Sequence, residues 1–420
     1  MPPKKPIFRS ILLSRILLCV WVAVPILLAL SGCRSSADTV NGSAGAVQSP
    51  AASETPAPSR PSSVQASASV AVPTPALSAA ASPVPSSGLT EGGIMSPVTA
   101  VRLADAKSGW IGGMGFIART DDGGGSWTVQ YRGDGEVKQL FALNATEAWA
   151  VIGDNRMLLR TADGGKHWTE AGQVPNDGFL HFVNPQEAYS GNARTVDGGR
   201  TWTVLPVPQG LVGDAYFHDR QNAWAVVQGN GSIGVERTLD GGQTWSKVMT
   251  RPVLGQPTGA IIRSAGSDDA WVELIGDSGM SQTSYSLFHT TNGGKDWLTV
   301  LAHSTAGAGP APGVAEDEQA NRSGGSRPGP LYVVSPDAAF MGGQCPACDK
   351  PNTVGWTVDG GETWVNGTEE LPGYGVMLLA MADAKQGWLI TNEASQPSVM
   401  YTTDTGGTHW KKVHAFAAPQ

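Results

Sequence analysis

An eight-residue pattern recurs seven times between residues 120 and 410 of this 420-residue chain. Each copy begins with Thr, has Gly-Gly at its fourth and fifth positions and ends with Trp, as in residues 120–127 and 161–168. The third position is acidic or an amide in six copies: Asp122, Asp163, Asp197, Asp240, Asn292 and Asp359. In the seventh copy the acid, Asp404, is displaced by one residue. Such a repeat indicates an architecture built from one recurring supersecondary unit.

A second feature precedes every octet. It is a small residue followed by an aromatic one, as at Gly109-Trp110 and Ala148-Trp149. Thirteen Trp lie beyond residue 32, and twelve of them end an octet or occupy this aromatic position, the exception being Trp356. Because Trp follows the repeat so closely, we interpret it as structural rather than as an aromatic ligand site.

Each repeat predicts four short strands, which in the second repeat are residues 137–142, 148–152, 157–161 and 168–171. Repeats near 40 residues match the four-stranded blade of a β-propeller. The octet then forms the turn between the third and fourth strands, where Asp caps backbone N–H groups and Gly accepts positive φ. We therefore expect an all-β fold, a seven-bladed β-propeller with four-stranded blades, over residues 95–416.

The octets resemble the Asp-box (BNR) repeat, Ser/Thr-x-Asp-x-Gly-x-x-Trp, of sialidases, sortilin-type receptors, xyloglucanases and the photosystem II stability/assembly-factor family. An Arg before the Thr and an upstream Gly/Ala-Trp strand are most similar to the assembly-factor family. The resemblance covers about residues 96–415 and implies a single seven-bladed propeller on the lumenal or extracytoplasmic side. The Asp-box is specific for a fold and only weakly informative about function.

The N-terminus has the pattern of a secretory signal. Lys4, Lys5, Arg9 and Arg15 precede an apolar run that ends in Leu30-Ser31-Gly32-Cys33. The tetrapeptide resembles the bacterial lipobox, which implies a signal peptide over residues 1–32 and a diacylglycerol-modified Cys33 on an extracytoplasmic membrane face. The alternative is an uncleaved anchor helix over about residues 11–32, which is long enough to span a bilayer.

Residues 33–94 predict a disordered tether. Ser, Ala, Pro, Val and Thr dominate them, they have no aromatic residue, and they cannot bury enough apolar surface to fold. We interpret the segment either as a stalk or as sequence with no length requirement.

The net charge of the chain is −8, and four of its cations lie in the signal. The rest of the chain is therefore acidic and lacks the basic surface of a nucleic-acid binder.

Two connections depart from the repeat. The one over about residues 303–330 is longer than its counterparts and rich in Gly, Ala and Pro, and we expect it to be disordered. Cys345 and Cys348 are the two cysteines of the repeat region, and their close spacing outside the cytoplasm predicts a local disulfide. A zinc site would need two further ligands, and the sequence offers no second pair.

No Ser/His/Asp arrangement or metal-ligand pattern is evident, so we expect neither catalysis nor a metal or other cofactor. Sialidases have a Phe/Tyr-Arg-Ile-Pro motif, three clamping Arg and a Tyr/Glu pair. In this chain only Arg251-Pro252 partly matches the motif, and the other features have no counterpart. Glycosidases need two facing carboxylates. The loop-face carboxylates are Asp277, Asp349, Glu370 and Glu393, and their spacing pairs no two of them.

The residue before the octet Thr is Arg in four consecutive repeats: Arg119, Arg160, Arg194 and Arg237. In the assembly-factor family an Arg-rich patch is taken as a docking surface, and these positions match the Arg of the family repeat. If these four Arg form such a surface, they are solvent-accessible and bind a partner. The alternative is that each Arg pairs with a carboxylate or carbonyl of the adjacent blade.

The sequence therefore predicts a non-catalytic, lipid-anchored, extracytoplasmic propeller, monomeric, that binds another envelope protein as an assembly or quality-control factor. Its expected partners are membrane lipid, through Cys33, and an envelope protein, with no nucleic acid. The alternatives are a cell-wall or polysaccharide-binding propeller and, less favoured, a glycoside hydrolase of the sialidase type.

Overall fold

The computed structural model describes residues 97–253 and 256–418. The expected signal peptide, Cys33 and the tether lie outside the described residues. In the part of the chain that is described, no helix is both long and apolar enough to cross a membrane.

The described chain forms 26 strands in six antiparallel sheets, whose strands follow one another in chain order. The first sheet has six strands: β1 (Val98–Leu103), β2 (Gly109–Thr120), β3 (Thr128–Ala142), β4 (Ala148–Ile152), β5 (Met157–Thr161) and β6 (Thr169–Gln173). The second has β7 (Leu180–Phe182), β8 (Ala188–Ser190), β9 (Ala193–Thr195) and β10 (Thr203–Val204). The third has β11 (Tyr216–Phe217), β12 (Ala223–Gly229), β13 (Ser232–Thr238) and β14 (Ser246–Pro252).

The remaining three sheets also have four strands each. The fourth has β15 (Gly259–Arg263), β16 (Ala270–Ser278), β17 (Thr283–Thr290) and β18 (Leu298–His303). The fifth has β19 (Arg327–Val333), β20 (Ala339–Cys345), β21 (Lys350–Thr357) and β22 (Val365–Asn366), with a short 3₁₀ turn η1 (Pro346–Cys348) between β20 and β21. The sixth has β23 (Leu378–Met381), β24 (Gly387–Glu393), β25 (Gln396–Thr403) and β26 (Lys411–Ala415).

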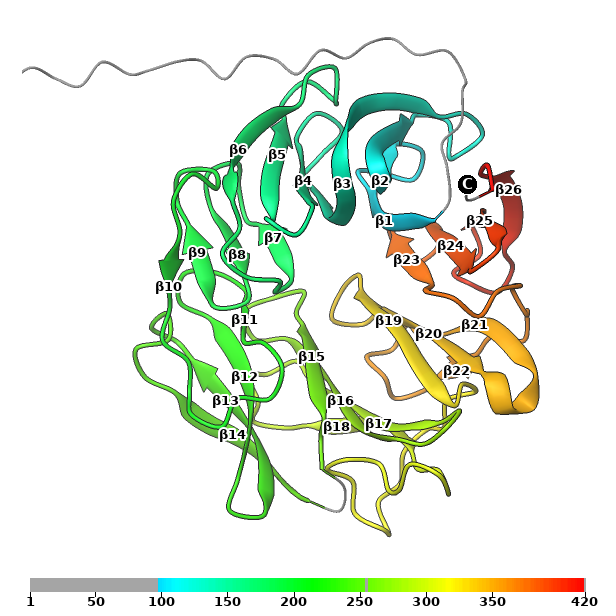
Figure 1. Cartoon of the computed structure of the whole chain (residues 1–420). Coiled ribbons are helices and arrows are strands. Elements are labelled where there is room, and N and C mark those ends of the chain that lie inside the picture. The colour runs from blue at the N-terminus through cyan, green and yellow to red at the C-terminus, as the bar shows by residue number, and fades with distance from the viewer. Residues whose placement is uncertain (1–96, 254–255, 419–420) are drawn as a thin grey trace, which may run out of the picture. The chain divides into compact units, whose positions relative to one another are not determined.

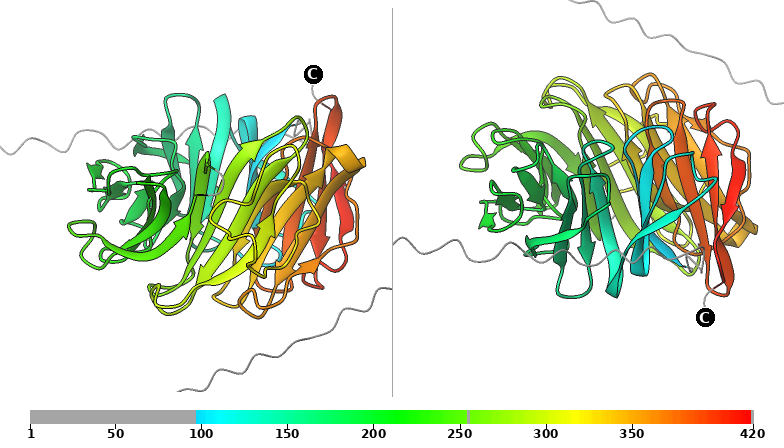
Figure 2. Two further views of the ribbon diagram at one scale, coloured as in Figure 1. Left: turned by 90° about the horizontal axis from the view of Figure 1, so that it is seen from below. Right: turned by 90° about the horizontal axis from the view of Figure 1, so that it is seen from above.

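These sheets are arranged around a central axis as a β-propeller (Figures 1 and 2). Figure 1 shows β1, β11, β15, β19 and β23 facing the centre of the ring, while β10, β14 and β26 lie at its outside. The predicted all-β propeller with four-stranded sheets is confirmed in this form.

The expected count of seven separate blades is wrong, because the structure has six sheets. The first two repeats share the six-stranded sheet through the 15-residue strand β3. This strand pairs with β2 as far as Glu136 and with β4 from Val137 onward. Residues 133–136 belong to this strand, with Gly135 at a positive φ of 94°, so the last strand of the first repeat runs directly into the first strand of the second.

The core lies between neighbouring sheets. The Trp of the small-aromatic pair is fully buried in several repeats. Trp149 and Trp224 are examples, and each belongs to an apolar cluster. This burial agrees with the structural role predicted for Trp, since a buried indole removes a large apolar area from water.

The ring closes where β1 meets the last sheet. The Val98 N–H donates to Ser398 Oγ at 3.1 Å, and Asn392 Nδ2 donates to the Val98 carbonyl at 3.0 Å. An apolar cluster joins residues of both ends, including Val98, Trp388 and Phe416. Among the described residues, β23–β26 are the strands of the last sheet, and packing and these hydrogen bonds connect it to β1.

The long connection between β18 and β19 is ordered, so the expectation of disorder is wrong. Ala311 and Val314 are buried in the cluster that includes Val272 and Leu274. Glu318 accepts from Arg251 Nη1 at 2.9 Å and from the Ala315 N–H at 3.3 Å. Its Gly- and Ala-rich composition suggested disorder, whereas the apolar contacts and the ion pair that fix it come from distant residues.

Candidate functional site

The octets form turns with one shared hydrogen-bond pattern. In the first copy Thr120 Oγ1 donates to Asp122 Oδ1 at 2.7 Å and accepts the Gly124 N–H at 3.0 Å. The Ser126 N–H and hydroxyl both donate to the Asp122 carboxylate. The same positions are bonded in the copies with Asp163, Asp197, Asp240, Asn292 and Asp359.

The acid displaced in the seventh copy does not cap its turn. Thr405 stands at the third position, and its Oγ1 accepts the His409 N–H at 3.0 Å. A hydroxyl thus replaces the carboxylate, and Asp404 is exposed.

The turn hydrogen bonds favour the ionised carboxylates. Those from Ser126 and Thr120 lower the pKa of Asp122 to about 2, and those from Thr244 and Thr238 do the same for Asp240. The octet carboxylates are therefore used within their own turns.

Two of the four Arg that precede the octets, Arg119 and Arg237, reach into the next repeat. The Arg119 side chain is 12% exposed, lies 4.7 Å from the Trp110 ring centroid and donates to the Gly164 carbonyl of the next octet. Arg237, also 12% exposed, contacts Trp224 at 4.9 Å and donates to the Gly293 carbonyl.

All four Arg also have carboxylate partners, which are Asp121 for Arg119 and Asp268 for Arg237, both at 2.6 Å. Arg160 Nη2 lies 3.3 Å from Glu147 Oε1. Arg194 Nη2 lies 2.7 Å from Glu187, whose side chain is only 7% exposed and also accepts from Arg220. Both carboxylates belong to the same repeat as their Arg, and the side chains of Arg160 and Arg194 are 29% and 25% exposed. Only Arg119 and Arg237 therefore match the inter-blade alternative, and we call these two the clamps.

His289 takes the same place in the fifth repeat. It stacks on Trp271 at 3.7 Å, and its Nδ1 lies 2.7 Å from the Gly360 carbonyl of the following octet. Its Nε2 lies 2.8 Å from Asp269 Oδ1. The imidazole thus makes the contact that Arg119 and Arg237 make, which indicates a role of this position in joining neighbouring octets.

The central channel holds a set of side chains that the sequence analysis missed. Strand register pairs one inner-strand residue per repeat with the aromatic residue of the second strand. We call these residues the collar: Arg102, Phe141, His181, Tyr216, Arg263, Tyr332 and Ala380. Each lies eight positions before its aromatic partner, so aligning the repeats on that aromatic would have found the set.

Six of the collar residues, all except Ala380, line a cavity of about 390 Å³. Four of its lining residues, Phe179, His181, Tyr216 and Arg263, also line a second cavity of about 380 Å³, so the two adjoin along the channel. Arg102 pairs with Trp110, and Leu103, the last residue of β1, pairs with Gly109, the first residue of β2. The collar residue therefore lies one position from this end of its inner strand.

The collar is built from stacked cations and rings. The Arg102 guanidinium lies 4.5 Å from the Phe141 ring and 6.0 Å from that of Tyr332. Arg263 lies 3.9 Å from the ring of Phe179, an additional residue of the channel. These are distances at which a cation is attracted to an aromatic face.

Neither collar Arg has an ion pair with a carboxylate among residues 97–253 and 256–418. Arg102 Nε is buried without an acceptor there, and Arg263 Nη1 donates to the carbonyl of Ile262. Burial lowers the pKa of His181 to about 3, so this imidazole is neutral at physiological pH. The collar therefore presents two positive charges.

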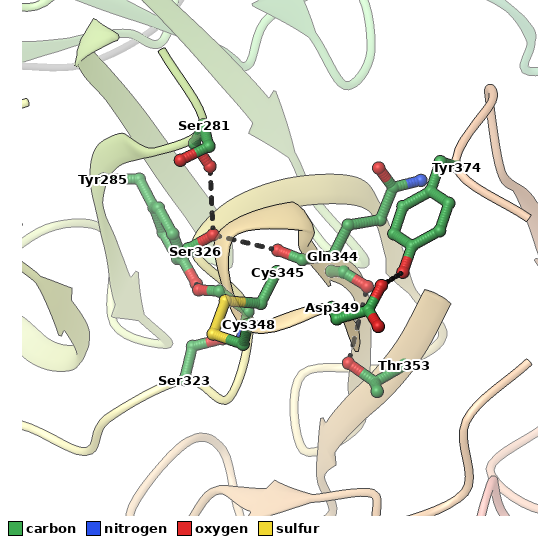
Figure 3. Close-up of a disulfide and its surroundings, with 12 residues drawn as sticks. Ser281, Tyr285, Ser323, Ser326, Gln344, Cys345, Cys348, Asp349, Thr353 and Tyr374 are labelled. Atoms are coloured by element: carbon green, nitrogen blue, oxygen red, sulfur yellow. Dashed lines mark hydrogen bonds between the residues drawn. A yellow bond between two sulfur atoms is a disulfide. The ribbon is translucent and has the colours of Figure 1, made fainter. Parts of the chain in front are cut away.

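The predicted disulfide between Cys345 and Cys348 is formed, with the Cα atoms 5.2 Å apart (Figure 3). It closes the tip of the β20–β21 hairpin, beside Asp349, whose carboxylate accepts from the Tyr374 hydroxyl at 3.1 Å (Figure 3). The backbone N–H of Tyr374 donates to Glu393, so the fold gathers two loop-face carboxylates that sequence spacing did not pair.

Desolvation and the nearby Asp349 raise the pKa of the Tyr374 phenol. In the described ranges, no group of three His, Cys, Asp or Glu side chains could hold a metal ion.

No family model and no curated protein matches this chain. Solved structures resemble it at low identity. YCF48 bound to a D1 peptide is 16% identical, covering 74% of this chain and 92% of that chain, with a TM-score of 0.43. YCF48 from Cyanidioschyzon merolae is also 16% identical, covering 79% and 88%, with a TM-score of 0.31.

A puromycin-hydrolyzing peptidase from Mycobacterium tuberculosis is 11% identical, covering 76% of this chain and 54% of that chain, with a TM-score of 0.49. These structures thus include both a peptide-bound protein and an enzyme. Because identity does not exceed 16% and each TM-score is below 0.5, these similarities assign no function to this chain.

Proposed function

We propose that this chain is a non-catalytic binding protein that holds a segment of another envelope protein, as an assembly or quality-control factor does. In this proposal the octets are Asp-box turns and acylated Cys33 anchors the protein to the extracytoplasmic face of a bacterial membrane. The propeller then acts as a monomeric, rigid platform.

The collar is the observation that supports this function best. The Arg that precede the octets are engaged by carboxylates or by the next octet, as the contacts of Arg160 with Glu147 and of Arg119 with Gly164 illustrate. By contrast, Arg102 and Arg263 face a cavity of about 390 Å³ without a carboxylate partner in the described chain. Buried or half-buried cations are normally paired, so an unpaired pair in a cavity favours an anionic ligand group.

Polysaccharide binding is the second candidate function. The Phe141, Tyr216 and Tyr332 rings at the cavity favour it, because aromatic faces also pack on sugars. A glycan array separates this candidate from protein binding, since a carbohydrate receptor would retain defined glycans on the array.

Crosslinking in membranes followed by mass spectrometry tests the proposed function. We expect wild type to enrich one envelope protein, and Arg102→Gln with Arg263→Gln to reduce that enrichment at least fivefold. Arg200→Gln is the matched control, because Arg200 is an exposed Arg outside the collar. Equal enrichment by the collar variant, or glycan binding without a protein partner, would contradict the proposal.

A further inference from the structure

The two collar guanidinium groups keep N–H donors that no carboxylate of the described chain accepts, although Arg263 Nη1 donates to the Ile262 carbonyl. Arg102 lies 4.5 Å from the Phe141 ring centroid and Arg263 lies 3.9 Å from that of Phe179. Stacking occupies the flat face of a guanidinium, whereas its N–H donors lie at the edge in the same plane. That edge matches the two oxygens of a carboxylate.

The rest of the cavity is largely apolar. Val101, Leu140, Leu331 and Leu379 line it together with the aromatic residues. A ligand held here by its charged group therefore places an apolar or aromatic body against these side chains, whose burial adds to binding in proportion to area.

Charge further along the channel limits the ligand to one anionic group. Asp177 and Asp214 line the adjoining cavity together with Lys138. Asp177 pairs with Arg156 at 3.5 Å and Lys138 pairs with Asp154 at 2.9 Å, so Asp214 is the lining carboxylate without an ion pair in the described chain. A second anionic group on the ligand would meet this carboxylate and be repelled. Since His181 is neutral, it adds no positive charge to offset them.

We propose that the collar recognises a single carboxylate joined to an apolar or aromatic body, with Arg102 and Arg263 as its binding residues. The inference rests on the proposed function, because it names the chemical group by which the partner segment is held. A phosphate or a polyanion is disfavoured, since it would spread charge toward Asp214.

Ligand-observed NMR on the full chain in detergent tests this inference with four probes. They are 3-phenylpropionate, its neutral amide 3-phenylpropanamide, the dicarboxylate glutarate and inorganic phosphate. We expect saturation transfer to 3-phenylpropionate that is at least fivefold stronger than to the amide. We expect neither glutarate nor phosphate to displace it at equal concentration.

Arg102→Gln and Arg263→Gln should each reduce the phenylpropionate signal at least fivefold, and Arg200→Gln should leave it unchanged. Equal signals from the acid and the amide, or displacement by phosphate, would overturn the inference. If a Gln variant fails to fold, the comparison of acid with amide on the wild-type chain still decides the matter.

The outcomes also separate this inference from the proposed function. If partner crosslinking depends on Arg102 and Arg263 but phenylpropionate does not bind, the ligand class is wrong and the binding function stands. If phenylpropionate binds through both Arg but no envelope protein crosslinks, the carboxylate site stands and the proposed partner is wrong.

Discussion

At the scale of single residues, the octets show how one side chain can organise a turn. The third-position carboxylate of the first copy accepts from Thr120 and from the Ser126 N–H and hydroxyl, all within the same eight residues. The acceptor can change, since Asn292 and Thr405 serve the same N–H position in the fifth and seventh copies. The turn therefore requires an oxygen at this position more than it requires a charge.

Asp163→Ala should lower the free energy of unfolding by about 1 kcal/mol, the net value of a typical intramolecular hydrogen bond. The loss stays near the low end because the His167 N–H that it leaves is exposed to water. Asp404→Ala is the control, and we expect it to have a smaller effect, since Asp404 caps no turn. Urea unfolding of both variants measures the difference, and equal losses would argue against turn capping.

Glu273 is a residue that the proposed function does not use. It is fully buried on β16, and neither carboxylate oxygen has a hydrogen-bond partner in the described chain. Burial raises the pKa of Glu273 to about 8, although the positive charge of Arg263 opposes this shift. The carboxyl is therefore protonated in the folded protein at neutral pH.

Stability should consequently fall as pH rises through the range in which only the unfolded chain loses this proton. That range extends from the ordinary Glu pKa of about 4.3 to the folded value of about 8. Glu273→Gln removes the titration, so the variant should show a flatter pH profile and exceed wild type in stability near pH 8. Urea unfolding from about pH 5 to about pH 8 checks this, with exposed Glu370→Gln as control; parallel profiles would refute it.

At the scale of elements, one strand register connects the channel to the outer turns. In the first repeat Arg102 pairs with Trp110, and Trp110 carries the stacked Arg119. In the fifth repeat Arg263 pairs with Trp271, on which His289 stacks. The aromatic residue of the second strand therefore separates the collar from the clamps, and its repetition places both at equivalent positions.

Arg237→Ala should lower the free energy of unfolding by about 2–3 kcal/mol. The change removes the contact with Trp224 and leaves the Gly293 and Ser267 carbonyls without this donor. Exposed Arg200→Ala should stay within about 0.5 kcal/mol of wild type. Thermal melting compares the two; if Arg237→Ala melts like wild type while partner binding falls, the clamp interpretation is wrong and a docking role is favoured.

The connection between β18 and β19 depends on Glu318. Burial opposes ionisation of this carboxyl, but hydrogen bonds from Thr299 and Ala315 and the charge of Arg251 lower its pKa. Glu318→Gln should therefore loosen the connection and speed proteolysis within residues 304–326, while Glu316→Gln, at an exposed position, should not. Timed digestion with mass spectrometry measures the rates, and equal rates would show that apolar packing alone holds the segment.

At the scale of the whole molecule, the propeller has one seam, between β1 and the last sheet. There Asn392 donates to the carbonyls of Val98 and Val376, and Ser398 Oγ donates to Asn392 Oδ1. A fully bonded buried polar group favours one register of the seam, and removing one member takes hydrogen bonds from the others. The hydrogen bonds that close the ring thus involve few residues.

Asn392→Ala should lower the free energy of unfolding by about 2–4 kcal/mol, because it removes the amide that donates to the Val98 and Val376 carbonyls and accepts from Ser398 in a buried site. Amide hydrogen exchange should rise first in β1 and in β23–β26. Asn155→Ala is a control in an exposed turn. Uniform protection loss around the ring would contradict a local seam.

The sequence by itself determined the strands and turns, because their causes are local. The octet hydrogen bonds join residues at most four apart, and β4 and β5 begin and end at the predicted positions. The sequence also contains each collar residue at a constant spacing from its aromatic partner. That spacing, however, has no meaning until the strands are placed around a common axis.

Tertiary structure alone decided how the repeats join. Continuous pairing through β3 merged two repeats into one sheet, and contacts between the chain's ends closed the ring. Tertiary structure also gave two Arg different surroundings. Arg119 donates to Gly164 of the next octet, whereas the Arg263 guanidinium lies over the ring of Phe179. Whether an Arg is clamped or faces a cavity depends on partners tens of residues away, which local sequence patterns do not specify.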